Sequence, residues 1–310
     1  MAKKHVTFAV CTYNRANRLS DLLDEMLSQE STLPYEILIV ENNCTDNTID
    51  LIKKKMKSSN GLIRFVSEPR QGIVFARNRA IEESLGSDYL VFIDDDELPC
   101  KGFLQAAIDA FLNHHCDVVG GKIQVNFENK IRPKWLTDDL LIPLAAINYG
   151  DTSFFITDKT TPLWTSNIAY NTKIFKKGLR FNLKYNREGY DVGGGEDWIM
   201  FTEFIDMGIP VMYQPSMATN HFIEAWRVKR RYFYKLYYRI GYKEGLWNPQ
   251  KSEIFYFGIP RYAFGQLLHS IFATLKSLYR FDKRWLKKSL KMVYFIGIIM
   301  GYFKKNISHS

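Results

Sequence analysis

The segment VFIDDDELP, residues 91–99, places four acidic side chains directly behind an apolar run. The apolar run is typical of a strand that is buried in a parallel sheet. Neighbouring carboxylates repel one another, and a carboxylate at the end of a buried strand loses part of its hydration. The pattern therefore predicts a positively charged partner for the cluster, although a solvated turn is the alternative for an acidic run taken alone.

The chain around this segment alternates between strand and helix patterns. Short apolar runs rich in β-branched residues precede segments with helical spacing of apolar side chains. The expected strands are residues 5–10, 35–42, 61–69 and 88–96, and the expected helices are residues 18–29, 45–58 and 72–86. This order predicts an α/β domain in three layers, with a mixed, mostly parallel sheet and right-handed crossovers.

Polar side chains follow three of the expected strands. They are Thr12–Arg15, Glu41–Asn43 and Asp94–Asp96. In an open α/β sheet, ligands bind beyond the carboxyl ends of the strands, so these three groups are expected to line one crevice. Mg²⁺ and Mn²⁺ prefer oxygen ligands and are commonly held by one or two carboxylates together with substrate phosphates. A divalent cation between Asp96 and a diphosphate would offset the repulsion within the acidic cluster.

The net charge of +9 over 310 residues hides an uneven distribution. From Ile223 onward there are 18 Lys and Arg against 4 Asp and Glu, a balance of +14, and the rest of the chain carries −5. We therefore expect an acidic body over residues 1–222 and a basic helical extension over residues 223–310. The four cysteines show no CxxC spacing, and the apolar stretch in MAKKHVTFAVCTYNR is too short for a signal peptide, so a cytoplasmic protein is expected.

The basic extension is rich in Tyr, Phe and Trp, which suits an anionic membrane surface. Its longest uncharged run, MVYFIGIIMGYF at residues 292–303, is shorter than the roughly 20 residues that a membrane span requires. We expect the extension to lie on the inner face of the membrane as a peripheral element. Packing into a hydrophobic core or a homodimer interface is the alternative, and no nucleic-acid-binding motif accompanies the charge.

Six segments, in order along residues 5–222, resemble family 2 glycosyltransferases with the GT-A nucleotide-sugar fold. Cys11 stands where that family usually has proline, and Glu41 replaces its common aspartate. The matching segments are CTYNRANRL, ILIVENNCTDNT, GIVFARNRAIEES, FIDDDELP, SNIAYNTKIFKKGLRFN and GGGEDWIMFTEF. The resemblance implies an α/β, GT-A type Rossmann-like domain that binds a nucleotide-sugar donor.

The resemblance also implies a role for individual residues at the donor site. Arg77 is expected to face the diphosphate or the sugar, because its fork suits phosphate oxygens, with a helix-surface arginine as the alternative. Asn167 is expected to line the sugar pocket. The residues implied for nucleotide and donor binding are Thr12, Tyr13, Arg15, Glu41, Asn43, Arg77, Asp94, Asp95 and Asn167.

The metal and the catalytic base are implied in the same way. Asp96 and Asp94, the D-x-D pair, would hold Mn²⁺ or Mg²⁺, and His221 would complete the metal site unless it is a structural histidine. Inverting transfer needs a carboxylate that takes the proton of the acceptor hydroxyl. The resemblance assigns this role to Asp197, with Glu196 in support, while a helix N-terminus that favours acidic residues is a compatible explanation.

We therefore expect a metal-dependent inverting glycosyltransferase. Its donor would be a nucleotide-diphosphate sugar, with a UDP-sugar as the preferred expectation. Its acceptor would be a hydroxyl group of a glycan, and the basic extension indicates that this glycan is lipid-linked. Two alternatives remain open. A HAD-type phosphatase has a motif similar to VFIDDDEL, although Leu98 stands where that family has Thr or Val, and a non-catalytic sugar-nucleotide-binding protein would lack the base.

Overall fold

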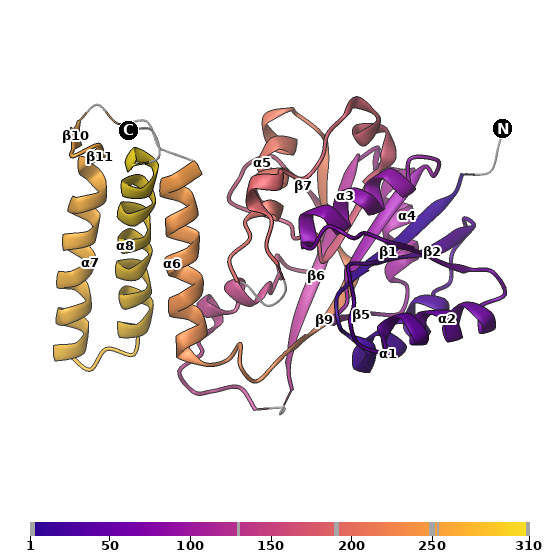
Figure 1. Ribbon diagram of the computed structural model, residues 1–310, viewed down its shortest axis with the longest axis horizontal. Coiled ribbons are helices and arrows are strands. Elements are labelled where there is room, and N and C mark those ends of the chain that lie inside the picture. The colour runs from indigo at the N-terminus through magenta and orange to yellow at the C-terminus, as the bar shows by residue number, and fades with distance from the viewer. Residues whose placement is uncertain (1–3, 129–130, 189–191, 248–251, 253, 308–310) are drawn as a thin grey trace. The chain divides into compact units, whose positions relative to one another are not determined.

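The computed structural model describes residues 4–128, 131–188, 192–247, 252 and 254–307 (Figure 1). The chain divides into two compact units. The first comprises Met1–Lys130, Leu144–Tyr190 and Gly195–Ile223, and the second comprises Ile131–Pro143, Asp191–Gly194 and Glu224–Ser310. The sequence-based limits, a catalytic domain over residues 1–222 and a basic helical region over residues 223–310, stay a prediction.

A nine-stranded sheet forms the centre of the first unit, in the order β3-β2-β1-β4-β8-β6-β9-β5, with β7 paired to β9. Six strands run in one direction, and β5, β7 and β8 run against them, so the predicted mixed, mostly parallel sheet is confirmed. The strands are β1 (Val6–Thr12), β2 (Tyr35–Glu41), β3 (Ile63–Ser67), β4 (Tyr89–Asp94), β5 (Glu97–Pro99), β6 (Val118–Phe127), β7 (Phe154–Ile156), β8 (Asn167–Asn171) and β9 (Val211–Ile223).

Helices cover both faces of this sheet, as the alternating pattern predicted. Alternate residues of each buried strand point to opposite faces, so two separate apolar cores form. One core packs β1, β2 and β4 against α1, α2 and α4, and the other packs the same strands against α3 and α5. These helices are α1 (Ala16–Leu27), α2 (Thr48–Ser58), α3 (Ile73–Glu83), α4 (Phe103–His114) and α5 (Glu196–Asp206).

The strand register brings the three predicted polar groups to the same edge of the sheet. Cys11 of β1 pairs with Asp94 of β4, and Thr12 of β1 pairs with Glu41 of β2. Because β1, β2 and β4 are parallel neighbours, the residues that follow them leave the sheet together. The predicted convergence of these strand ends is confirmed.

The second unit is mainly helical. None of the helices among the described residues is both long and apolar enough to cross a membrane. Its elements are α6 (Arg230–Trp247), α7 (Arg261–Tyr279), α8 (Trp285–Ile307), the short strands β10 (Phe255–Tyr256) and β11 (Ile259–Pro260), and a 3₁₀ turn at Asp138–Leu140. Another 3₁₀ turn, Ile142–Leu144, lies where the two units divide, and the turns Thr172–Lys177 and Leu183–Tyr185 belong to the first unit.

Glycines bring the backbones of α6 and α8 into direct contact. The pairs have the same G-x-x-x-G spacing on both helices, which is typical of closely packed helices. A β-carbon added at any of them would overlap a backbone carbonyl oxygen of the facing helix. The four glycines are Gly241 and Gly245 on α6, and Gly297 and Gly301 on α8.

The close approach of these helices predicts the effect of a single methyl group. Gly245→Ala should destabilise the protein by about 1–3 kcal/mol, because the helices must separate to admit the β-carbon. Gly265→Ala on α7 is the matched control, since nothing lies within 4 Å of its β-carbon position. The control should stabilise α7 by about 0.5–1 kcal/mol through helix propensity. Urea unfolding of both variants measures the difference, and equal stability of the two would contradict this packing.

Candidate functional site

The acidic turn lies between β4 and β5 and is fastened to β9. Asp94 ends β4, Glu97 begins β5, and Asp95 and Asp96 form the connection. Glu97 pairs with His221 in the antiparallel ladder of β5 and β9, and the backbone carbonyl of Asp96 accepts a hydrogen bond from the Phe222 amide at 2.9 Å. The four acidic side chains are therefore held in a fixed backbone and not in a solvated loop.

A buried, positively charged partner of this turn is Arg77 of α3, which contacts Asp94. The Arg77 side chain is only 1% exposed, which excludes the surface-arginine alternative. One terminal nitrogen lies 2.7 Å from Asp197 Oδ1 and 3.2 Å from Glu196 Oε1, and the other lies 3.2 Å from Asp94 Oδ1. Burial alone would lower the pKa of Arg77, but the carboxylates of Asp197, Asp94 and Glu196 raise it above its usual value.

The two carboxylates of α5 differ in exposure. Gly195 precedes the helix with φ at 92°, a conformation that glycine adopts without strain. Glu196 and Asp197 then occupy the first turn, where the helix dipole favours negative charge. Glu196 is 2% exposed and also lies 3.3 Å from Arg187 Nε, whereas Asp197 is 22% exposed. Of the pair, Asp197 is the carboxylate that an incoming hydroxyl can reach.

Asp95 faces the loop that follows β1. Its Oδ2 accepts a hydrogen bond from the Tyr13 amide at 3.4 Å, and its Oδ1 lies 3.7 Å from Arg15 Nε. Burial and the charge of Asp96 raise the pKa of Asp95 to about 7, while Arg15 opposes the shift. The structure therefore brings Tyr13, Arg15 and Asp95 together at the predicted donor site.

Asp96 and His221 form a second pair. His221 Nε2 lies 3.4 Å from Asp96 Oδ2. Beside them, Glu97 is 1% exposed, and burial together with the charge of Asp94 raises its pKa to about 8, against the opposing effect of His221. Within the described part of the chain, no group of three or more His, Cys, Asp and Glu side chains is arranged to hold a metal ion. A carboxylate oxygen beside an imidazole nitrogen still fits a cation whose remaining ligands come from a substrate diphosphate and water.

The residues at the ends of β1 and β2 have structural partners of their own. Thr12 and Glu41 are buried, and the Glu41 carboxylate accepts a hydrogen bond from the Cys44 amide. Asn43 is exposed, with φ at 63°, and its Nδ2 donates to Gln71 Oε1 at 3.3 Å. Glu41 thus holds the loop that presents Asn43, and binding of a nucleotide by these residues stays a prediction.

The hydrogen bonds of Asn167 go to neighbouring strands and not to the charged cluster. Asn167 is fully buried on β8, and its Nδ2 donates to the backbone carbonyls of Lys122 at 3.0 Å and Met217 at 2.9 Å. These bonds give Asn167 a structural role between strands. A contact of Asn167 with the donor sugar stays a prediction.

Two charged residues of the site were not assigned from the sequence. Arg187 pairs with Glu196, and Glu97 is the buried carboxylate opposite His221. A signal existed for Arg187, because this basic residue stands nine positions before the Glu196–Asp197 pair. Glu97 belongs to the quoted acidic run, and its pairing became visible only with the register of β5 and β9.

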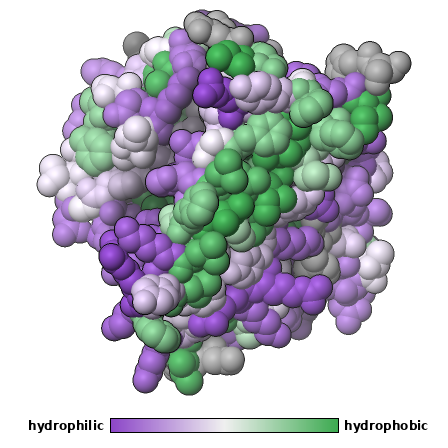
Figure 2. All heavy atoms as spheres, turned by 90° about the vertical axis from the view of Figure 1, so that its left-hand side faces the viewer, coloured by the Kyte–Doolittle hydropathy of each residue, from purple (hydrophilic) through white to green (hydrophobic). Residues whose placement is uncertain are grey.

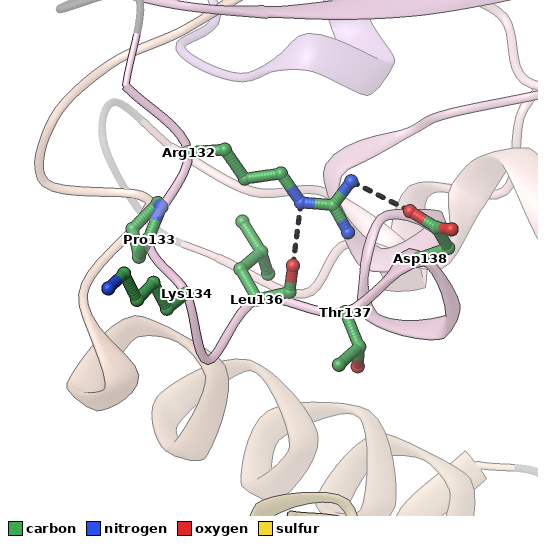
Figure 3. A pocket seen from close by; sticks show the side chains of 6 residues that line it. All are labelled: Arg132, Pro133, Lys134, Leu136, Thr137 and Asp138. Atoms are coloured by element: carbon green, nitrogen blue, oxygen red, sulfur yellow. Dashed lines mark hydrogen bonds and ion pairs between the residues drawn. The ribbon is translucent and has the colours of Figure 1, made fainter.

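A shallow pocket in the second unit does not involve these residues (Figure 3). The Arg132 guanidinium is occupied there by Asp138 Oδ1 at 2.7 Å and by the Leu136 carbonyl at 2.6 Å. The pocket is lined by Arg132, Pro133, Lys134, Leu136, Thr137 and Asp138. The titratable cluster around Arg77, and not this pocket, is the candidate site.

Replacement of Arg77 tests how much the cluster depends on its buried cation. Arg77→Met should cost about 3–5 kcal/mol of unfolding free energy, because three carboxylates lose their shared partner. Arg79→Gln, two residues along α3, is the control, since Arg79 is 34% exposed and its ion-pair partner is Glu83 of the same helix. The control should cost no more than about 1 kcal/mol. Urea unfolding distinguishes the two, and a loss from Arg77→Met as small as that of the control would contradict the assignment.

Comparison with known proteins gives a family match. The model of the family described as "Glycosyl transferase family 2" matches residues 7–179. Glycosyltransferase AglE of Haloferax volcanii is 29% identical over 127 residues, which is 40% of this chain and 41% of that protein. The putative teichuronic acid biosynthesis glycosyltransferase TuaG of Bacillus subtilis is 27% identical over 114 residues, 37% of this chain and 44% of that protein. The chain thus matches less than half the length of these relatives.

Solved structures share the fold at low sequence identity. The mannosyltransferase PcManGT from Pyrobaculum calidifontis, in complex with GDP-Man and Mn²⁺, has a TM-score of 0.62 at 16% identity, covering 100% of this chain and 89% of that one. S. aureus TarS 1–349 in complex with UDP-GlcNAc has a TM-score of 0.54 at 17% identity, covering 96% and 81%. These matches confirm the predicted GT-A type fold.

Proposed function

The chain belongs to glycosyl transferase family 2, as its motifs predicted, and from this premise we propose that it transfers a sugar from a nucleotide-diphosphate donor to a hydroxyl group of a glycan. One observation carries the proposal. Arg77 contacts Asp94, assigned to the donor, and Asp197, assigned to the acceptor, with the two nitrogens of one guanidinium. The donor and the base are thereby set a fixed distance apart, which is what a single displacement at the sugar requires.

The geometry favours Asp197 as the base. An inverting transfer needs a carboxylate that accepts the acceptor's proton as its oxygen attacks the sugar opposite the leaving group. Asp197 is partly exposed and paired with Arg77, while Glu196 is enclosed between Arg77 and Arg187. In this proposal Glu196 orients Arg77 and supports Asp197, and does not itself take the proton.

A divalent cation, Mn²⁺ or Mg²⁺, fits the charge of the site. Six carboxylates gather there with three guanidinium groups, so a surplus of negative charge remains. Asp96 and His221, with Asp94 beside them, would hold the cation, and PcManGT is a structural relative solved with Mn²⁺. When bound, such a cation supplies positive charge to the departing diphosphate. The residues of this chain bind and orient the donor, and Asp197 serves as the base.

The nucleotide would lie at the ends of β1 and β2. Thr12, Tyr13, Arg15, Glu41 and Asn43 surround this position, with Asp95 behind them. We propose a UDP-sugar as donor, which TarS binds in its structure, although PcManGT holds GDP-Man. Glu41 accepts a backbone hydrogen bond in this structure, so its contact with base or ribose would use its other carboxylate oxygen.

The acceptor is proposed to be a lipid-linked glycan in the synthesis of a cell-surface polysaccharide. Relatives that support this class include TuaG and the poly(ribitol-phosphate) β-N-acetylglucosaminyltransferase TarS of Staphylococcus aureus. The basic extension, with 18 Lys and Arg against 4 Asp and Glu, would place the enzyme on the inner face of an anionic membrane. In that setting the acceptor's diphosphate carrier also meets basic side chains.

The phosphatase alternative does not fit the architecture. In that family the nucleophilic aspartate follows the first strand of the sheet. Here the acidic turn follows β4, the fourth strand along the chain, and Leu98 occupies the position of the Thr or Val. The non-catalytic alternative is decided by whether nucleoside diphosphate is released from a donor.

Metal dependence is tested at Asp96. Asp96→Ala should abolish transfer and weaken binding of UDP only when Mn²⁺ or Mg²⁺ is present, because the substitution removes an oxygen ligand from the proposed site. Calorimetric titration of UDP with Mn²⁺ and with EDTA separates the two conditions. Asp50→Ala, an exposed position on α2, is the control and should bind as the wild type does. Turnover by Asp96→Ala that equals the wild type and still stops with EDTA would place the cation elsewhere.

The base is tested by a substitution that keeps its shape. Asp197→Asn should leave UDP affinity within about twofold and lower transfer by about 10²–10⁴-fold, the usual contribution of a positioned base. Asp206→Asn, at the exposed end of the same helix, should leave transfer unchanged. Nuclear magnetic resonance of the product should show the inverted anomer. A product with the donor's anomeric configuration would refute the mechanism.

A further inference from the structure

The helix α7 has its apolar side chains on the outside. Its most deeply buried side chains are small and at most 7% exposed, and the partly buried Tyr262, Phe264 and Leu267 complete the packing against α8 near the start of the helix. The small residues are Ala263, Ser270, Thr274 and Ser277. The opposite face carries large apolar side chains, with exposed fractions of 57% at Leu268, 69% at Phe272, 57% at Leu275 and 86% at Tyr279. A surface helix of a water-soluble protein shows the reverse arrangement.

Two of the three hydroxyl groups on the buried face of α7 bond to the helix itself, while the buried Ser277 hydroxyl has no hydrogen-bond partner among the described residues. The Ser270 hydroxyl donates to the Gln266 carbonyl at 2.7 Å, and the Thr274 hydroxyl donates to the Ser270 carbonyl at 2.7 Å. Hydroxyls bonded to their own helix in this way are satisfied without solvent. The contact between α6 and α8 is likewise made by residues without large side chains, the four glycines. Helices whose interiors are filled by small residues and whose outer faces are apolar are typical of a lipid environment.

Figure 2 shows a continuous hydrophobic stripe on the molecule's face that is on the left in Figure 1, where α7 lies, with hydrophilic residues along both sides. Both ends of α7 carry exposed aromatic residues. Phe257 is 95% exposed in the turn between β10 and β11, just before the helix, and Phe281 is 94% exposed just after it. Large apolar patches with a polar rim mark interaction sites, and aromatic rings suit the headgroup level of a bilayer.

From these features we propose that the outer face of α7, defined by Leu268, Phe272, Leu275 and Tyr279, inserts into the headgroup region of an anionic bilayer. This deepens the proposed function, on which its biological purpose rests, because it names the surface that would bring the enzyme to a lipid-linked acceptor. The helix would lie in the plane of the membrane, with its apolar face buried and its small-residue face on α8.

Charge decides between a bilayer and a second copy of the chain. Residues 261–305 contain ten Lys and Arg and one acidic residue, Asp282. Two copies that joined their apolar stripes would bring these basic residues together, and like charges repel across an interface. Anionic headgroups complement them, at about 1 kcal/mol for each Lys or Arg near the surface.

Sedimentation of the full chain with vesicles tests the surface. The wild type should bind vesicles of phosphatidylcholine with phosphatidylglycerol more tightly than phosphatidylcholine alone, and salt should weaken the binding without abolishing it. The double variant Phe272→Glu, Leu275→Glu should bind at least about tenfold more weakly, because two large apolar side chains no longer leave water. The matched control, Leu112→Glu with Met207→Glu, changes two exposed apolar residues of the first unit by the same charge and should bind like that wild type.

Binding of UDP with Mn²⁺ by the same proteins separates this inference from the proposed function. Loss of vesicle binding with intact UDP binding and an unchanged circular dichroism spectrum supports the surface. A wild type that binds vesicles through α7 but binds no nucleotide would refute the proposed function and leave the surface in place. Equal vesicle binding by the double variant and the wild type would overturn the inference. The inference would also be overturned if the wild type were a dimer without affinity for vesicles and the double variant were a monomer, since α7 would then bind a second copy.

Discussion

A single buried guanidinium, that of Arg77, faces three carboxylates from two other elements of the sheet domain. Its side chain is almost inaccessible to water, and an isolated charge in that position would be strongly unfavourable. The three carboxylates offset this penalty, and their ion pairs with Arg77 of α3 hold them at the end of β4 and in the first turn of α5. Much of the geometry of the site follows from this one contact, because Asp94 and Asp197 cannot move independently of Arg77.

Even with Arg77, the site contains fewer positively charged groups than carboxylates. Arg77, Arg15 and Arg187 face six carboxylates, and the pKa values of Asp95 and Glu97 rise to about 7 and about 8 as a result of burial and neighbouring negative charge. A carboxyl group with a raised pKa keeps its proton near neutral pH, and a bound metal cation would displace that proton. Proton uptake in the free site, and the uptake of a cation with a diphosphate that we propose, would both reduce the same excess of negative charge.

The fold could largely be predicted from the sequence because strand and helix periods are local properties. The runs ending at Thr12, Glu41 and Asp94 became parallel neighbours in the sheet. The contacts of the site could be predicted only in part. Arg77 lies 17 residues from Asp94 and 120 from Asp197, and no local pattern shows that one guanidinium joins them. The hydrogen bonds of Asn167 and the ion pair of Arg187 could not be predicted for the same reason, since their partners depend on strand register and loop path.

The second unit shows a different limit. Composition predicts that residues 223–310 are basic, aromatic and helical, and periodicity shows that α7 has an apolar face and a small, polar face. Periodicity cannot show which face is turned inward, and the usual rule of an apolar interior would have buried Leu268 and Phe272. The structure shows the other outcome, with Ala263, Ser270 and Thr274 buried and Leu268 and Phe272 exposed. The apolar face of α7 is therefore left outside by the packing of the unit, and the affinity for lipid that we propose for it depends on that exposure.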